Sequence, residues 1–184
     1  TEMSPLGTSN SSGARRHQYD TDSFTAMRTN VGQPIFGVEV KITDDDNNEL
    51  PWDGVAFGAL KVRGPWICSS YFKLEGSSAH AEEGWCETGD VATIDARGNV
   101  SITDRTKDVI KSGGEWISSI EVENCATGHP MVAEAAVIGR NHPKWGERPL
   151  LIVVKNGQGD VTPDELKTFL DGKIAKWWIP DDVQ

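Results

Sequence analysis

The organisation of the chain is decided by one stretch at residues 103–118, Thr103-Asp104-Arg105-Thr106-Lys107-Asp108-Val109-Ile110-Lys111-Ser112-Gly113-Gly114-Glu115-Trp116-Ile117-Ser118. Its charged side chains are too dense to be buried together without pairing, and they follow neither a helical nor a strand period. The stretch therefore predicts a polar connector. Gly113 and Gly114 carry no Cβ, so a ligand or another segment can approach their backbone closely. Taken alone, the same features also fit a plain surface loop with a glycine turn.

Two further motifs accompany the connector. Trp85-Cys86-Glu87-Thr88-Gly89-Asp90 lies upstream of it, and Thr1-Glu2 opens the chain. In order, the three motifs resemble those of the adenylate-forming superfamily, whose acyl-CoA synthetases activate a carboxylate with ATP and then transfer it to coenzyme A. The connector continues in the register of that family's hinge motif at Ile117, Glu121 and Glu123. Three matches in this order are more specific than any one of them.

The resemblance implies roles for individual residues. A carboxylate can accept hydrogen bonds from two vicinal ribose hydroxyls, and one carboxylate with water and phosphate oxygens commonly holds Mg²⁺ beside a nucleotide. Without the resemblance, Asp90 would be an ordinary turn residue and Glu2 an ordinary N-terminal residue. The implied assignment puts Thr1, Asp90 and Arg105 at ATP or AMP, Glu2 at Mg²⁺, Gly113 and Gly114 along the path of coenzyme A, and Lys107 at a hinge.

By the same resemblance, the full-length protein is an acid-thiol ligase that takes a carboxylic acid, ATP and coenzyme A. The local sequences at residues 64–66, 111–118 and 142–147 most resemble those of medium- and long-chain fatty-acyl-CoA synthetases. We expect no catalytic residue in this chain, because the family's phosphate loop lies upstream of Thr1 and its C-terminal lysine lies beyond Pro180. The chain then resembles an inactive C-terminal fragment. Two alternatives stay open: an adenylation module serving a carrier protein, and a non-catalytic nucleotide-binding module.

Composition narrows the function further. The 184 residues are enough to bury a core, and a net charge of −10 argues against a nucleic-acid partner. No apolar run approaches the roughly 20 residues of a membrane span, and no signal-peptide pattern is present. We therefore expect a cytoplasmic protein.

The cysteines and histidines give no metal pattern. The three cysteines form no C-x-x-C pair and have no histidine at zinc-finger spacing, so they are predicted to be buried thiols in a reducing compartment. The four histidines are scattered and are predicted to be surface or capping residues. These residues are Cys68, Cys86, Cys125, His17, His80, His129 and His142.

The first 106 residues predict a β-rich unit of an α+β protein. Residues 1–30 are linker-like and are expected to be mobile. An alternating pattern at 38–43 and a segment at 58–64 that ends at a Gly-Pro stop predict strands. Segments 91–95 and 100–103 predict a hairpin across Ala96-Arg97-Gly98. By resemblance, this unit is the barrel-like, β-rich end of the large adenylating domain.

Residues 107–184 predict a small, mobile C-terminal α+β domain. Ser118 and Glu121 form a possible capping box at the start of one helix, and Thr162 caps a second. A buried strand is expected at 132–139 and another at 148–154, within a sheet of three strands. Trp177 and Trp178 are predicted to pack in the core. Lys107 is predicted to be the pivot between two domains, although a rigid loop inside one domain is an alternative.

Overall fold

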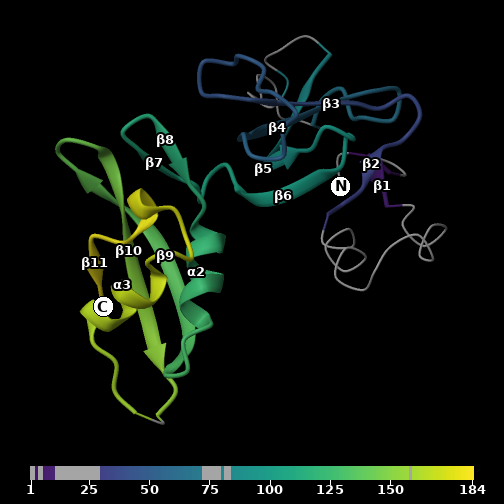
Figure 1. Cartoon of the computed structure of the whole chain (residues 1–184). Helices are drawn as coiled ribbons and strands as arrows, with labels where there is room; N and C mark the ends of the chain where they lie inside the picture. The colour runs from purple at the N-terminus through teal and green to yellow at the C-terminus, as the bar shows by residue number, and fades with distance from the viewer. Residues whose placement is uncertain (1–2, 4–5, 11–29, 72–79, 81–83, 158) are drawn as a thin grey trace. The chain divides into compact units, whose positions relative to one another are not determined.

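The computed structural model describes residues 3, 6–10, 30–71, 80, 84–157 and 159–184. Within it the chain divides into two compact units, Thr1–Thr106 and Lys107–Gln184 (Figure 1). The α+β class expected from the sequence is confirmed. Among the described residues, no helix combines the length and the apolarity that crossing a membrane requires.

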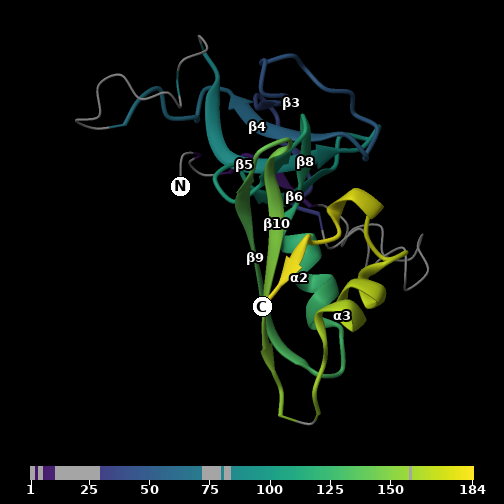
Figure 2. The same cartoon turned by 90° about the vertical axis from the view of Figure 1, so that its left-hand side faces the viewer.

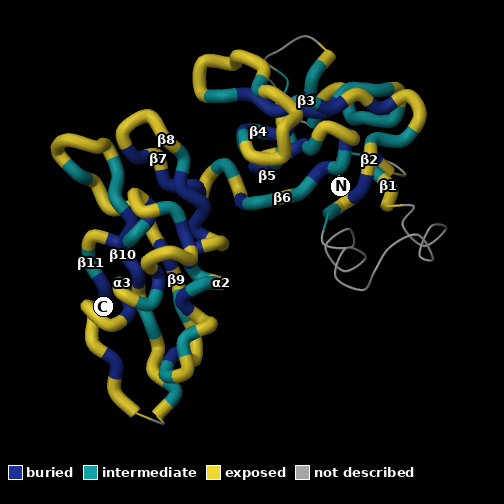
Figure 3. The backbone as a smooth tube through the Cα atoms, in the orientation of Figure 1, coloured by how far each residue is buried: buried dark blue, intermediate teal, exposed yellow. Residues whose placement is uncertain are grey.

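The first unit is built on a four-stranded antiparallel sheet. Its strands follow the chain order, β3 (Glu39–Thr43), β4 (Phe57–Arg63), β5 (Cys86–Ile94) and β6 (Val100–Arg105). A short pair, β1 (Thr8–Ser9) with β2 (Gln33–Pro34), forms a separate two-stranded sheet, and Gly32, just before β2, bridges to Val100 of β6. The β4 residues Leu60 and Val62 are buried together with residues of β3, β5 and β6, forming the dark band in Figure 3. In the described residues the sheet is open rather than barrel-like, since β3 and β6 are not paired to each other.

The predicted hairpin across Ala96-Arg97-Gly98 is confirmed as β5 and β6. Asp95 closes its turn, because its Oδ1 accepts the N–H groups of Arg97 at 2.9 Å and Asn99 at 2.8 Å. Such Asx contacts are the reason Asp is favoured in turns.

The second unit contains a five-stranded sheet. The strand order is β11 (Asp182–Val183), β10 (Gly146–Lys155), β7 (Ile110–Ser112) and β8 (Glu115–Ile117), and β9 (Val132–His142) also pairs with β10. The expectation of three strands is therefore corrected. The end of the polar stretch supplies the small hairpin β7–β8, which was too short to show a strand period, and β11 has only two residues.

Two helices and a short 3₁₀ turn complete the second unit. They are α2 (Ser119–Thr127), α3 (Pro163–Leu170) and η3 (Lys176–Trp178). Figure 2 shows α2 and α3 on the same side of the β9–β10 pair. Because helices cover one face of this pair, β9 is not the buried strand that its apolar composition predicts: Val132 and Val137 are buried, whereas Ala136 and Ile138 are exposed.

The predicted helix starts are confirmed by their caps. The Ser118 hydroxyl accepts the Glu121 N–H at 3.2 Å, and Thr162 and Glu165 form a reciprocal capping box. Glu123 on α2 then reaches β9, where its Oε1 accepts the Val137 N–H at 2.8 Å. The helix α2 is thus fixed against the strand by a charged hydrogen bond as well as by packing.

Candidate functional site

Asp90 and Arg105 are direct partners across the β5–β6 ladder. They stand opposite each other in the register, and Arg105 Nε lies 3.1 Å from Asp90 Oδ1. The Arg105 side chain is 59% exposed and the Asp90 side chain 25% exposed, so both remain accessible to a ligand. The structure therefore brings together the two residues that the motifs suggested for the nucleotide.

The strand is distorted where it carries Asp90. Ala59 of β4 pairs with Val91, but Lys61 pairs with Glu87, so β5 carries extra residues opposite Leu60. A bulge of this kind redirects a side chain and is common beside active sites. Thr88, Gly89 and Asp90 stand opposite the single residue Leu60, so β5 carries two extra residues here.

Side-chain and backbone contacts hold the bulge. Thr88 Oγ1 donates to the Leu60 carbonyl and accepts the Asp90 N–H, both at 3.1 Å. Gly89 has a φ of +76°, which L-residues rarely adopt, and its carbonyl accepts the Thr106 N–H at 3.0 Å. The T-G-D order is therefore explained by local geometry: Thr88 braces the bulge, Gly89 adopts the left-handed conformation, and Asp90 stands opposite Arg105.

Asp104 holds the backbone of its neighbour Arg105. Its residue is 1% exposed, and its Oδ1 accepts the backbone N–H of Arg105 at 2.7 Å. This contact fixes the backbone from which the Arg105 side chain leaves. Asp104 is thus a positioning residue, which its place in a polar connector did not indicate.

Gly113 and Gly114 form the turn between β7 and β8. Both have positive φ, +62° and +89°, as a two-residue hairpin turn requires. A Cβ on Gly113 would lie 2.9 Å from Cε3 of Trp145, whereas a Cβ on Gly114 would meet nothing within 4 Å. The main chain at Gly114 is therefore open to an approaching group, and that at Gly113 is covered by an indole.

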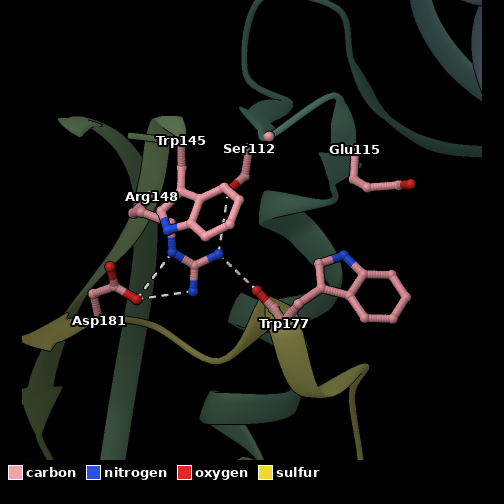
Figure 4. Close-up of a pocket in the computed structure, with 7 residues that line it drawn as sticks. Ser112, Glu115, Trp145, Arg148, Trp177 and Asp181 are labelled. Atoms are coloured by element: carbon pink, nitrogen blue, oxygen red, sulfur yellow. Dashed lines mark hydrogen bonds and ion pairs between the residues drawn. The ribbon is translucent and has the colours of Figure 1, made fainter. Parts of the chain in front are cut away.

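A pocket of about 340 Å³ opens beside this turn (Figure 4). Trp145 and Trp177 supply aromatic surface and Arg148 supplies the positive charge. Trp177 is 54% exposed, so the expectation that both Trp177 and Trp178 belong to the core is correct only for Trp178, which is 8% exposed. The full lining is Ser112, Gly113, Glu115, Trp145, Arg148, Trp177 and Asp181.

Arg148 organises the pocket wall. Its guanidinium contacts Asp181 Oδ1 from Nε at 2.9 Å and from Nη2 at 2.8 Å, as the dashed lines of Figure 4 show. It also donates to the carbonyls of Trp177 at 2.8 Å and Ile179 at 3.1 Å, and to Ser112 Oγ at 3.2 Å. One side chain thereby links β7 and β10 to the segment that carries Trp177.

The remaining predicted site residues are Lys107, Thr1 and Glu2. Lys107 is exposed in the turn of residues 106–108, at the first position of the second unit. Thr1 and Glu2 lie outside the described residues. The pocket residues Trp145, Arg148 and Trp177 were missed, because nothing in their local sequence shows that residues so far apart share one wall.

Comparison with known proteins identifies relatives along the whole chain. Residues 121–184 match the model of the AMP-binding enzyme C-terminal domain. All of the chain aligns at 55% identity with 34% of a 3-methylmercaptopropionyl-CoA ligase of Ruegeria lacuscaerulensis. A medium-chain-fatty-acid–CoA ligase of Ectopseudomonas oleovorans is 46% identical over 98% of this chain and 33% of its own length. The chain spans about a third of the length of the curated relatives that it matches.

Solved structures of similar fold are also synthetases. The o-succinylbenzoate-CoA synthetase of Bacillus subtilis, in complex with its acyl-adenylate intermediate, gives a TM-score of 0.72 at 33% identity, covering 90% of this chain and 34% of that one. The amide bond synthetase McbA of Marinactinospora thermotolerans gives 0.72 at 34% identity, covering 89% of this chain and 33% of that one. Similar folds thus occur in a CoA synthetase and in an amide bond synthetase.

Proposed function

The chain belongs to the adenylate-forming superfamily, and we propose that the full-length protein uses ATP to join a carboxylic acid to coenzyme A. In the first half-reaction a carboxylate oxygen attacks the α-phosphate of ATP, and pyrophosphate leaves. In the second, the thiol of coenzyme A loses its proton and attacks the acyl carbon, and AMP leaves. We assign no residue of this chain to bond making or breaking. We propose that its residues bind the nucleotide and coenzyme A and let one domain rotate against the other.

The observation that carries the proposal is the pairing of Asp90 with Arg105. The ladder places Asp90 opposite Arg105, and the guanidinium, 3.1 Å from Asp90 Oδ1, keeps the carboxylate oriented while leaving its other oxygen available. Such a pair fits a ribose with two vicinal hydroxyls. Mg²⁺ at Glu2 and a nucleotide contact at Thr1 belong to the same proposal and lie outside the described residues.

The path of coenzyme A is proposed along the β7–β8 turn. Open space at Gly114 suits a thin pantetheine arm passing the main chain. The neighbouring pocket is within the size range of small-molecule sites, and its indole faces and single arginine suit a ligand with both an aromatic ring and phosphate groups. These features support coenzyme A as the acceptor.

Lys107 is proposed as the pivot that lets one protein run both half-reactions. A rotation needs a few connector residues that can absorb a large change in φ and ψ. Lys107 is exposed at the boundary of two compact units, so no core packing restrains it. The first unit is then the end of the large domain and the second is the small C-terminal domain.

For the acid, we propose an aliphatic monocarboxylate. The relatives named above are a ligase for 3-methylmercaptopropionate and one for medium-chain fatty acids. A panel of 3-methylmercaptopropionate and saturated acids of increasing length, assayed by pyrophosphate release with the full-length protein, separates the two. The three cysteines lie outside disulfides, which suits a reducing compartment and supports a cytoplasmic location.

Asp90→Ala in the full-length protein tests the ribose assignment. Hydrogen bonds to a charged group contribute about 1.5–3 kcal/mol, so the ATP concentration needed for half-maximal rate should rise about 10- to 100-fold. The wild type should discriminate against 2′- or 3′-deoxy-ATP, and the variant should not. Glu39→Ala is the matched control, because Glu39 pairs with Arg63 on the same sheet without a bulge. Unchanged discrimination in Asp90→Ala would refute the assignment.

Two variants test the acceptor and the pivot. Gly114→Leu should keep acid-dependent pyrophosphate exchange and lose acyl-CoA formation, because its side chain would fill the open path. Lys107→Pro fixes φ near −65° and should leave one half-reaction while the other fails. If Lys107 lies in a rigid loop, both half-reactions should fall together with stability. Replacing coenzyme A by an amine or a carrier protein tests the other acceptors.

A further inference from the structure

Cys68, His80 and Cys86 meet in the first unit. Their potential ligand atoms all lie within 4.8 Å of one another. Cys68 follows the end of β4 and Cys86 begins β5, while His80 stands between them in the sequence. Their spacing matches no zinc-finger pattern, so the sequence predicted buried thiols and a surface or capping histidine. The structure confirms that Cys86 is buried, gives Cys68 intermediate burial, and brings the three side chains together.

Packing holds the three residues in place. Cys86 is 1% exposed and belongs to the apolar core of the sheet, and Cys68 packs against that core. The His80 imidazole lies edge-on to Tyr71, with ring centroids 5.6 Å apart and an interplanar angle of 72°. The cluster is therefore anchored on the core through Cys86 and Cys68.

The hydrogen bonds of His80 leave one ring nitrogen without a donor or acceptor. Its Nε2 lies 2.9 Å from the Cys68 carbonyl oxygen, and a carbonyl can only accept, so Nε2 carries the proton. Nδ1 then holds a lone pair, is buried, and has no hydrogen-bond partner among the described residues. A buried polar atom left in this way costs free energy. Two thiols packed as small apolar side chains would account for the cysteines but not for this nitrogen.

We propose that Cys68, His80 and Cys86 bind a thiophilic divalent cation of the zinc type. In tetrahedral coordination, bonds of about 2.3 Å to sulfur and 2.0–2.1 Å to nitrogen put neighbouring ligand atoms about 3.5–3.8 Å apart. The three potential ligand atoms lie within 4.8 Å of one another, so closing their separations to this range needs shifts of about an ångström. Thiolate and imidazole together favour Zn²⁺ over Mg²⁺ or Ca²⁺.

The surroundings fit such a site. A metal-bound histidine usually donates its other ring N–H to a carbonyl or carboxylate, as the Cys68 carbonyl allows here. Binding would convert both thiols to thiolates and release two protons to solvent, with no change of oxidation state. The three protein ligands leave a fourth position for water.

The bound cation would connect the end of β4 to the start of β5. The same two strands carry the Thr88-Gly89-Asp90 bulge and its brace at Leu60. We therefore assign the cation a structural role, in which it stabilises the first unit and takes no part in the chemistry.

Cobalt substitution tests the site directly. The 184-residue chain, reduced and stripped with a chelator, is titrated with Co²⁺. One equivalent should give a thiolate-to-cobalt charge-transfer band with the intense visible bands of tetrahedral cobalt, and Zn²⁺ should abolish both. Cys68→Ser and Cys86→Ser should each weaken the charge-transfer band and lower affinity by more than about 100-fold, beyond the range for second-shell partners. His80→Gln should shift the visible bands and lower affinity, because it removes the nitrogen ligand.

Cys125→Ser is the matched control, because Cys125 lies on α2 in the second unit. It should retain the spectrum and the affinity. Zn²⁺ should also raise the thermal midpoint of the first unit in the wild type and in Cys125→Ser, and should leave Cys68→Ser unchanged. Absence of the charge-transfer band at one equivalent, or a band that survives in both Cys68→Ser and Cys86→Ser, would overturn the proposal.

Discussion

Replacing Arg148 by methionine should destabilise the second unit strongly, whereas the same change at Arg140 should do little. The two arginines are direct cross-strand partners on β10 and β9. Each also pairs with an aspartate near the end of the chain, Arg148 with Asp181 and Arg140 with Asp182. The comparison therefore holds the residue type, sheet and kind of partner constant, and varies burial and the number of hydrogen bonds.

The magnitude follows from those contacts. Arg148 is 15% exposed and donates five hydrogen bonds, to one carboxylate oxygen, one hydroxyl and two carbonyls. Losing five hydrogen bonds at roughly 0.5–1.5 kcal/mol each, discounted because Asp181 is 40% exposed, should cost about 3 kcal/mol in total. Arg140 is 56% exposed and makes a single contact at 3.0 Å, so its loss should cost about 0–1 kcal/mol. Methionine keeps most of the apolar stem, which limits the cavity term.

Urea unfolding followed by two-dimensional NMR measures the effect unit by unit. Cross-peaks from residues such as Leu151, which is fully buried, report the second unit, and those from Ile42 report the first. The difference between Arg148→Met and Arg140→Met should exceed about 2 kcal/mol in the second unit and should vanish in the first. Equal effects of the two substitutions, or a loss below about 1 kcal/mol for Arg148→Met, would refute the reasoning that this guanidinium fixes the pocket wall.

Three further predictions concern local features. Thr162→Ala should lower the free energy of unfolding of the second unit by about 1 kcal/mol in urea denaturation, because it removes the cap of α3, and Thr162→Ser should restore it. The Thr162 backbone N–H, followed by its hydroxyl, lowers the pKa of Glu165. The stabilising contribution of the Glu165 carboxylate should be complete above the unfolded pKa of about 4.3 and be lost as the pH falls through the lower folded pKa. Carboxyl NMR titration measures the pKa. Glu165→Gln should flatten the decrease in stability at acid pH. Gly113→Ala and Gly114→Ala should each cost about 1–2 kcal/mol because of positive φ, but only Gly113→Ala should shift the Trp145 indole resonance, since only its Cβ would contact that ring.

Much of the local structure follows from the sequence. The sequence predicts strands at 38–43, 58–64, 91–95 and 100–103, with a hairpin across residues 96–98, and helix starts at Ser118 and Thr162. The structure confirms these elements, although β5 begins earlier than predicted, at Cys86. These features depend on neighbouring residues, so local chemistry is enough to find them. The opposition of Asp90 and Arg105 also follows, because a hairpin register brings its two ends together.

The remaining features depend on contacts that no local pattern records. Trp145, Arg148 and Trp177 share a wall only because β10 and the segment after α3 lie side by side. Lys111 and Ser112 read as connector, yet they pair with Trp116 and Glu115 as a small hairpin. The Cys68, His80 and Cys86 cluster likewise joins residues that no local sequence pattern connects.

The last hydrogen bond before the boundary between the units joins the Thr106 N–H to the carbonyl of Gly89, beside Asp90. Strand ends open more readily than strand centres, so this bond is where fraying of β6 would begin. A ligand held by Asp90 and Arg105 would suppress that fraying, and by thermodynamic linkage an ordered Thr106 would tighten the ligand by the same free energy. Exchange of the Thr106 amide proton is therefore a direct measure of how strongly occupancy at the ribose edge restrains the start of the connector.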